Sequence, residues 1–277
     1  SLVWNSRIPG KGTLARLLSR LLIPKPKGRV ISKNIFGFDL LLDPLIDNGV
    51  ERSLYCFGAY EQGTLKFMEE NLKQDSVFFD IGANIGLMSI YASYRVGKTG
   101  RVFSFEANPE TVNILQYNID LNKIENITVV DKAAGNKNGT IKIYNNWNVN
   151  RGGATLIKPQ QESSSFDVDL IKIDSVSEYI DLNISMIKID VEGFEMDVLM
   201  GLEKILQKKD APALIIECSE DRNNNYSSVY ALFDFIKSVN SYKIYKLSRT
   251  KERIGKLVEI TTREDLPKHD NIFCIKN

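Results

Sequence analysis

The chain is poor in the residues that build metal sites and disulfide frameworks. Its 277 residues include one histidine, His269, and three cysteines, Cys56, Cys218 and Cys274. The cysteines are odd in number, lie far apart and lack the short spacings of metal ligands, which argues against a disulfide framework and favours a reducing compartment. We therefore expect a cytoplasmic protein.

The sequence also lacks a charge bias and a long apolar run. Lys and Arg number 36 against 35 Asp and Glu, which gives a net charge of +1. Nucleic-acid binding needs a broad basic surface, so we expect no nucleic-acid partner. No apolar stretch approaches the roughly 20 residues of a membrane span, and the first residues show no cleavable signal pattern. We expect no transmembrane segment.

The first part of the chain predicts an extension in front of a larger domain. Between residues 13 and 23, leucines gather on one helical face and arginines on the other. We favour a helix that caps the core, and weak peripheral contact with a membrane surface stays open. Residues 30–42 alternate loosely around a turn, which predicts a β-hairpin. We assign 1–59 to an N-terminal extension, a cap or lid, and 60–277 to the main domain.

From residue 77 onward, strand and helix patterns alternate, which is typical of an α/β fold with a mainly parallel sheet and helices on both faces. The strands are expected at 77–79, 102–105, 127–130, 186–190, 213–217, 242–247 and 271–275, with an edge strand at 139–144. Other stretches are predicted to be irregular. We expect a loop-rich approach at 47–63, either an active-site flap or an ordinary loop at 145–155, and a surface excursion at 248–268.

The stretch Val77–Gly86 predicts a strand, a tight turn and the start of a helix. Glycine-rich turns of this kind bind dinucleotides or S-adenosylmethionine. Asn84 occupies the place where a dinucleotide fingerprint has its middle glycine. The carboxylate of Asp80 would repel a phosphate, but it suits the ammonium of a methionine moiety. These features favour S-adenosylmethionine, and a nicotinamide-dependent oxidoreductase stays open as an alternative.

Glu106 ends the next predicted strand, 20 residues beyond Gly86. An acid at the end of the second strand of such a unit is placed to accept hydrogen bonds from ribose hydroxyls. The predicted cofactor-binding residues are Asp80, Gly82, Ala83, Asn84, Gly86, Glu106, Ala107, Asp131 and Asp190.

A second informative stretch is Met186–Glu195. Strand alternation places Lys188 and Asp190 on the same side of a buried strand, and Glu192 follows in the turn. Two opposite charges in a buried strand can form a purely structural ion pair. They also lie at the carboxyl end of a strand, where open α/β sheets bind their ligands. Both interpretations stay open at this point.

Together, Phe79–Gly86 and Ile187–Glu195 resemble the FkbM family of S-adenosylmethionine-dependent methyltransferases, over about residues 60–277. The resemblance implies a class I, Rossmann-like fold whose seven-stranded, mainly parallel sheet has an antiparallel last strand. It also implies that Asp80, Gly82, Asn84 and Gly86 cradle the cofactor and that Glu106 binds its ribose. Family members of assigned activity methylate hydroxyl groups on macrolides or on sugars of glycoconjugates. Many members carry a histidine soon after the acid of the fifth strand, where this chain has Glu217-Cys218-Ser219.

An alcohol acceptor must lose a proton during methyl transfer, so a base within hydrogen-bonding reach is needed. We expect Asp190 to be that base, Lys188 to hold it ionised and Glu192 to orient the substrate. His269 is expected to be a surface residue rather than the base. We assign no metal, although Mg²⁺ held by Asp190, Glu192 and Glu217 stays open.

The expected function is O-methylation of a sugar or glycoconjugate hydroxyl. The predicted acceptor-binding residues are Tyr60, Glu61, Asn146, Trp147, Asn150 and Glu217, because acids, amides and aromatic faces recognise sugars. An inactive module that kept only the fold is a further alternative, which the intact acids at 80, 106, 190 and 192 disfavour. The sequence gives no indication of oligomeric state.

Overall fold

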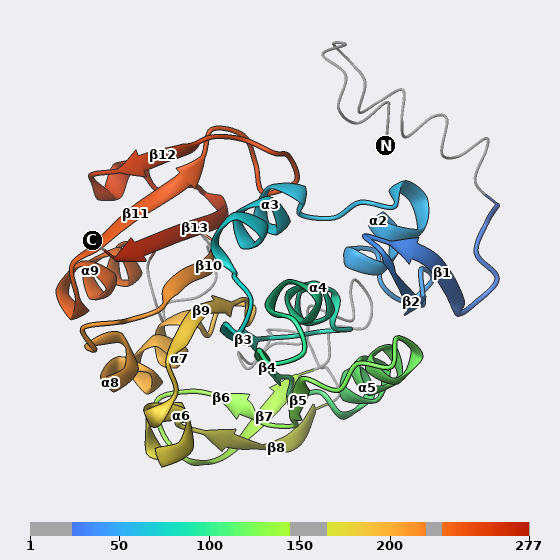
Figure 1. Ribbon diagram of the computed structural model, residues 1–277, viewed down its shortest axis with the longest axis horizontal. Helices are drawn as coiled ribbons and strands as arrows, with labels where there is room; N and C mark the ends of the chain where they lie inside the picture. Colours follow the sequence, from blue (N-terminus) through green and yellow to red (C-terminus); the bar gives the residue numbers. More distant parts are fainter. Residues whose placement is uncertain (1–23, 145–164, 220–228, 277) are drawn as a thin grey trace.

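A computed structural model describes residues 24–144, 165–219 and 229–276 (Figure 1). Within these ranges the main sheet has eight strands in the order β12-β11-β13-β10-β9-β3-β4-β5. Their bounds are β3 Val77–Ile81, β4 Arg101–Phe105, β5 Ile127–Val130, β9 Ile184–Ile189, β10 Ala213–Ser219, β11 Tyr242–Leu247, β12 Leu257–Ile260 and β13 His269–Lys276.

The strand directions confirm the expected class I methyltransferase fold. β5, β4, β3, β9 and β10 are parallel neighbours, and β13 runs antiparallel between β10 and β11. β12 pairs antiparallel with β11 and adds an edge strand beyond the expected seven. The prediction of a surface excursion at 248–268 is therefore wrong in part. β12 is short and mostly exposed, so its sequence has no alternating apolar pattern from which a strand could be predicted.

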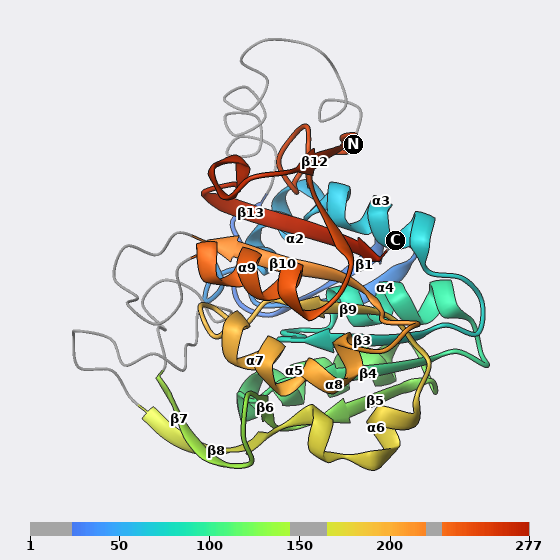
Figure 2. The same cartoon turned by 90° about the vertical axis from the view of Figure 1, so that its left-hand side faces the viewer.

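Alternation along the strands separates two apolar layers. Phe78 and Phe79, adjacent in β3, belong to different core clusters on the two sides of the sheet. The cluster with Phe79 takes in residues of α6 (Ser177–Asp181), α7 (Glu195–Gly201), α8 (Glu203–Leu206) and α9 (Val229–Val239). The cluster with Phe78 takes in α3 (Gln62–Asn71) and α4 (Leu87–Val96). Helices therefore cover both faces of the sheet, as Figures 1 and 2 show.

A small second sheet lies beyond β5 (Figure 1). It has the order β6-β8-β7, with bounds β6 Ala133–Ala134, β7 Gly139–Tyr144 and β8 Ser165–Ile171. The strand predicted at 139–144 is thus an edge strand, but of this second sheet. Its buried Ile143 packs with Ala133, Val168 and Leu170 in a separate cluster.

The predicted hairpin is present as β1 (Val30–Ile35) and β2 (Phe38–Leu42). Buried Phe38, Leu40 and Leu42 join the cluster that contains α3 and α4, so the hairpin is part of the core. The division of the chain at residue 59 stays a prediction.

The segment predicted to be loop-rich, 47–63, contains a helix, α2 (Val50–Phe57). That prediction is wrong because α2 is short and buries only Glu51 and Leu54, which leaves little helical periodicity to detect. The helix predicted at 13–23 and the flap predicted at 145–155 lie outside the described residues. In the part of the chain that the structure describes, no helix is both long and apolar enough to cross a membrane.

Asn118 ties the hairpin to the glycine-rich turn. It is fully buried in α5 (Pro109–Leu121). Its Oδ1 accepts from the Leu41 backbone N–H at 2.7 Å, and its Nδ2 donates to the Ile85 carbonyl at 2.9 Å. One amide side chain therefore satisfies two backbone groups from distant parts of the chain.

Replacing Asn118 with alanine should lower the free energy of unfolding by about 1–3 kcal/mol for each backbone group that loses its partner. Urea unfolding followed by circular dichroism measures this loss. Asn113→Ala, at an exposed position of the same helix, is the matched control and should have little effect. Equal unfolding curves for the two variants would show that water replaces the Asn118 contacts at no cost.

Candidate functional site

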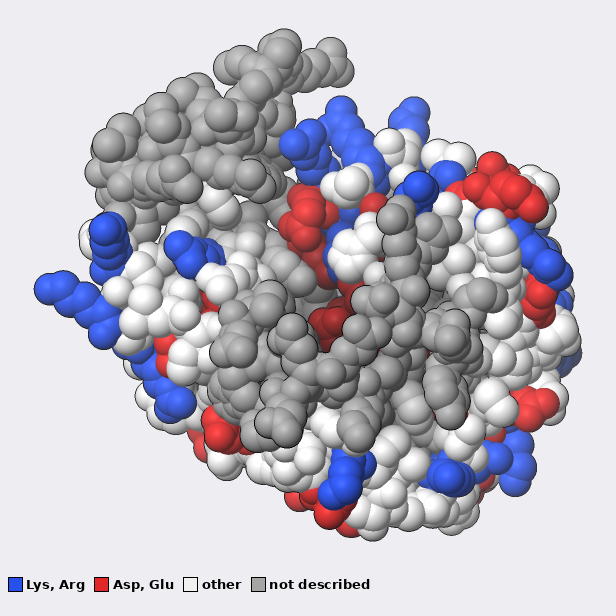
Figure 3. Space-filling view, turned by 180° about the vertical axis from the view of Figure 1, so that it is seen from behind, with Lys and Arg blue, Asp and Glu red and all other residues white. Residues whose placement is uncertain are grey.

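A pocket of about 1150 Å³, its open mouth included, lies at the carboxyl ends of the parallel strands β3, β4, β9 and β10. This is where open α/β sheets place their ligands, because the connections diverge there. Acidic side chains are visible at the bottom of a hollow in the face that Figure 3 shows.

Gly82 brings the two sequence motifs together. A Cβ atom built on it would lie 1.9 Å from the Asp190 carbonyl oxygen, and its φ of +83° is left-handed. The Asp190 backbone N–H also donates to the Ile81 carbonyl at 3.0 Å. The glycine therefore permits a close backbone contact with Asp190, the residue after β9. Asp80 and Lys188 are direct neighbours across the same pair of strands.

Backbone N–H groups hold the carboxylate of Glu106 in place, one of them from the glycine-rich turn. Its two carboxylate oxygens accept from the backbone N–H groups of Asn84 and Asn108, each at 2.9 Å. Burial raises the pKa of Glu106, and these backbone hydrogen bonds partly offset the rise. Each oxygen keeps a lone pair for a further donor, and the side chain lines the pocket.

Three buried polar atoms in the pocket wall have neither a hydrogen-bond partner nor an ion-pair partner among the described residues. They are Asp80 Oδ1, Asn84 Oδ1 and Asn108 Nδ2. A buried polar group without a partner costs about 1–3 kcal/mol, so such atoms are rare unless a ligand satisfies them. Their two acceptors and one donor lie beside Glu106, which fits a polar, nucleoside-bearing ligand.

Lys188 and Asp190 form the ion pair that the sequence left open as one interpretation. Lys188 Nζ lies 2.8 Å from Asp190 Oδ2, and the lysine side chain is 5% exposed. Burial alone would raise the pKa of Asp190, but Lys188 and Lys251 outweigh it and hold that pKa below its usual range. Burial would lower the pKa of Lys188, but Asp190 and Asp80 raise it. Both groups are therefore charged.

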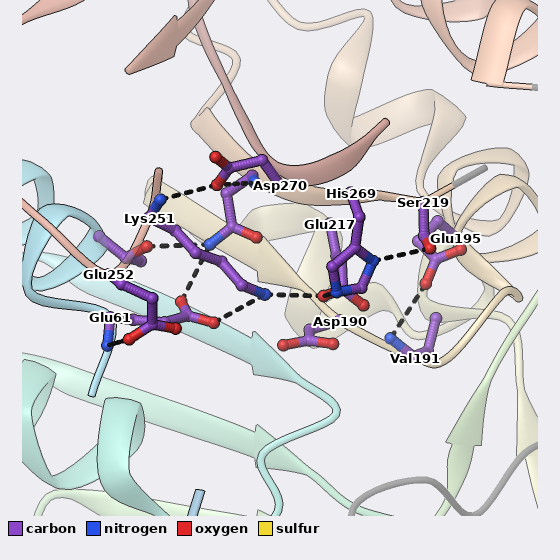
Figure 4. Close-up of polar contacts among 12 residues, drawn as sticks. Glu61, Asp190, Val191, Glu195, Glu217, Ser219, Lys251, Glu252, His269 and Asp270 are labelled. Atoms are coloured by element: carbon purple, nitrogen blue, oxygen red, sulfur yellow. Dashed lines mark hydrogen bonds and ion pairs between the residues drawn. The ribbon is translucent and has the colours of Figure 1, made fainter. Parts of the chain in front are cut away.

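Lys251 lies at the site, and the sequence did not predict it there. Its Nζ lies 2.9 Å from Glu61 Oε1 and 2.7 Å from Glu217 Oε1, and its side chain is 10% exposed (Figure 4). It lies in the segment that we predicted to be a surface excursion. A signal was available, because Lys251 follows the carboxyl end of β11 by four residues, and β11, which is antiparallel to β13, runs in the same direction as β10.

The loop after β11 is fixed against the start of α3. The Gly63 backbone N–H donates to the Lys251 carbonyl at 2.9 Å, and Glu61 N–H donates to Glu252 at 3.2 Å. Asn271 Nδ2 donates to the second Glu61 oxygen at 2.9 Å. The fully buried Glu61 carboxylate is thus occupied by Lys251 and Asn271, which suits a positioning role better than the predicted sugar contact.

Glu217 and Glu192 line the same pocket as Asp190. The Asp190 charge and burial raise the pKa of Glu217 to about 8. Burial, Asp190 and Glu195 raise the pKa of Glu192 to about 7. Among the described residues, no group of three or more His, Cys, Asp or Glu side chains is arranged to hold a metal ion. In this cluster Lys251 supplies positive charge at the place where the alternative left open by the sequence would put a Mg²⁺ ion.

Most of the predicted site residues line this pocket. The lining includes Asp80, Gly82, Ala83, Asn84, Glu106, Ala107, Lys188, Asp190, Glu192, Tyr60, Glu61 and Glu217. Gly86 instead begins α4 and faces Leu115, and Asp131 lies outside the lining, although Lys132 lies within it. The predicted residues Asn146, Trp147 and Asn150 lie outside the described ranges. Asn108, which was not predicted, lines the pocket.

His269 is exposed, as expected, but it lies beside the site. Its Nδ1 is 2.8 Å from Ser219 Oγ, and its Nε2 is 4.0 Å from Glu217 Oε1 (Figure 4). Ser219 and His269 are direct partners in the antiparallel pairing of β10 with β13. The register of β10 with β13 brings the His269 imidazole to the site. The two strands lie far apart in the sequence, so the sequence alone does not show that these residues are neighbours.

Comparison with known proteins shows which family has a sequence like that of this chain. A model of the methyltransferase FkbM domain matches residues 80–243, more than half of the chain. Methyltransferase 1 of Beauveria bassiana is 26% identical over 148 residues, which cover 47% of this chain and 59% of that protein. The hexuronic acid methyltransferase AglP of Haloferax volcanii is 26% identical over 148 residues, covering 53% of this chain and 58% of its own length.

The chain therefore spans less than two thirds of the length of these two relatives. Among solved structures, a methyltransferase FkbM from Methylobacillus flagellatus KT is similar with a TM-score of 0.46 and 22% sequence identity. That similarity covers 73% of this chain and 44% of the other.

Replacing Lys251 with methionine should lower the free energy of unfolding by about 3–5 kcal/mol, because it leaves a buried carboxylate without its cation. Urea unfolding near neutral pH measures the loss. Lys256→Met, at an exposed position of the same segment, is the control and should change stability by no more than about 0.5 kcal/mol. If the two variants unfold alike, Lys251 does not stabilise the cluster.

Proposed function

We propose that this chain, which belongs to the FkbM methyltransferase family, transfers the methyl group of S-adenosylmethionine to a hydroxyl of a sugar or glycoconjugate. The observation that carries the cofactor part is the pocket wall, where Glu106 and three partnerless buried polar atoms surround one cavity. The name of the relative AglP, a hexuronic acid methyltransferase, supports a sugar acceptor.

Within this proposal the turn from Asp80 to Gly86 and Glu106 hold the cofactor. Glu106 accepts hydrogen bonds from the ribose hydroxyls, and Asn84 and Asn108 supply the neighbouring acceptor and donor. Asp80, beside Lys188, faces the charged methionine end. When bound, S-adenosylmethionine supplies a methyl carbon on a positively charged sulfur, an already activated leaving group.

The acceptor lies at the other end of the same pocket. Asp190, kept ionised by Lys188, accepts a hydrogen bond from a hydroxyl next to the reacting one and so orients the acceptor. Tyr60 supplies an aromatic face, and Glu192 lies at the β9–α7 turn, where it orients further hydroxyls.

The acceptor class follows from the types of side chain. Carboxylates and a tyrosine recognise several hydroxyls at once, which a sugar presents and a simple alcohol does not. Nucleic acid is not part of the proposal, because the net charge is +1 and the site is acidic. A reducing, cytoplasmic setting remains part of it, on the ground of three free cysteines.

Replacing Glu106 with alanine should weaken binding of S-adenosylhomocysteine by about 1.5–3 kcal/mol, the value of hydrogen bonds to a charged group. Isothermal titration calorimetry measures the affinity, and circular dichroism checks that the turn still folds. Glu110→Ala, an exposed acid two residues into α5, is the control. Unchanged affinity in the Glu106 variant would remove this residue from the cofactor site.

The activity itself is tested with a panel of methyl glycosides of neutral hexoses, amino sugars and hexuronic acids. The chain should bind S-adenosylhomocysteine and not NAD in calorimetry. It should then convert one class of glycoside to a product heavier by one methylene group in mass spectrometry. Binding of NAD instead would favour the oxidoreductase alternative. Cofactor binding with no methylated glycoside would leave the fold assignment intact and contradict the sugar acceptor.

A further inference from the structure

The cluster around Glu217 extends from the pocket to the surface. Glu217 lies near the carboxyl end of β10, and its side chain lines the pocket and is 9% exposed. On the inner side it lies near Asp190, whose charge raises its pKa. On the outer side it faces the ring of His269, whose side chain is 67% exposed.

The ring of His269 is oriented for proton exchange with Glu217. The tautomer that donates from Nδ1–H to Ser219 Oγ, over 2.8 Å, leaves the Nε2 lone pair on the side of Glu217. The distance from Nε2 to Glu217 Oε1 is 4.0 Å, longer than a hydrogen bond. Because the ring is exposed, it has room to move closer or to exchange the proton through solvent.

Asp190 is a weaker candidate for the base than the sequence suggested. Its carboxylate is tied to Lys188 at 2.8 Å, and Lys251 lies beyond Glu217. Opposite charges hold the pKa of Asp190 low, which reduces its affinity for a proton. Glu217 differs, because the Asp190 charge and burial raise its pKa to about 8. A base is most effective when its pKa lies near the working pH.

We propose that Glu217 is the general base that takes the proton from the acceptor hydroxyl, and that His269, positioned by Ser219, carries this proton to solvent. The proposal rests on the methyl transfer proposed above and names which groups remove the proton.

The step balances without any further reactant. The acceptor oxygen forms its bond to the methyl carbon, and the electron pair of the carbon–sulfur bond returns to sulfur. The hydroxyl proton passes to the Glu217 carboxylate, then to His269 Nε2, and from the imidazolium to water. Glu217 and His269 end as they began. Lys251 stays protonated and keeps Glu217 oriented.

Charged groups from every neighbouring element act on Glu217. Asp190 and Glu192 raise its pKa, Lys251 lowers it, and Glu61 pairs with the same lysine. Because the base must be unprotonated, activity should fall as the pH drops through about 8. Glu217→Gln should lower kcat by at least ~10²-fold and abolish this pH dependence, while leaving binding of S-adenosylhomocysteine unchanged.

Asp190→Asn distinguishes the two candidate bases. If Glu217 is the base, this variant moves the pH dependence to lower pH, because the charge that raises the pKa of Glu217 is gone. If Asp190 is the base, Asp190→Asn loses the pH dependence and Glu217→Gln keeps most of its turnover, which would overturn the proposal. The acceptor in all assays is the methyl glycoside that wild type turns over fastest.

His269→Ala tests the exit step. It should lower kcat, and free imidazole in the buffer should restore the rate, because the position is open to solvent. Ser219→Ala should have the same effect in weaker form. Lys268→Gln, at the exposed neighbouring position, is the control and should keep the wild-type rate and pH profile. A His269→Ala variant with wild-type turnover would remove this residue from the path.

A measurement without any acceptor keeps the proposal testable on its own. His269 is the only histidine in the chain, so its ring proton signals in NMR need no assignment. In wild type they should respond to pH in two steps, one of them the titration of Glu217, whose pKa is raised to about 8. Glu217→Gln should remove that step.

A single step in wild type would show that the two groups are not coupled and would overturn the proposal. If no glycoside is methylated although both pH-dependent steps appear in the His269 signals, the proposed sugar acceptor is contradicted. The coupling between Glu217 and His269 is then still supported. Calorimetry with S-adenosylhomocysteine shows in each variant that the pocket is still folded.

Discussion

The site depends on the contact between the Gly82 position and the Asp190 carbonyl. A methyl group at residue 82 would lie 1.9 Å from that oxygen, so the two segments meet at this distance only with glycine there. The contact places the end of β3 against the end of β9. The turn that fits a nucleoside and the strand that carries Lys188 and Asp190 therefore form one pocket.

Charge balance is the second constraint on this pocket. Six acids line it, Glu61, Asp80, Glu106, Asp190, Glu192 and Glu217. Lys188 and Lys251 are buried among them, and each pairs with at least one carboxylate. Buried charges are tolerated only when they are paired, so both lysines are part of the structural framework as well as of the chemistry. The remaining negative charge suits a cationic cofactor.

The unequal environments of the carboxylates give them different roles. Asp190 and Glu217 each contact a buried lysine, but opposite charges hold the pKa of Asp190 low, whereas the Asp190 charge raises the pKa of Glu217. In the proposed mechanism, position alone thus makes one carboxylate an anchor and the other a proton acceptor. The sequence could not rank them, because both simply follow or end a buried strand, and Lys251 and His269 come from elements far along the chain.

The sequence by itself determined the family, the alternation of strands and helices, and many of the residues that line the pocket. These features depend on local patterns: period-two burial, glycines at a turn and acids at strand ends. Tertiary structure decided the rest. It placed β12 at the edge, built α2 where no periodicity was visible, and brought Lys251 and His269 to Glu217. Those contacts arise from strand register and loop packing between residues that are distant in sequence, which local patterns do not encode.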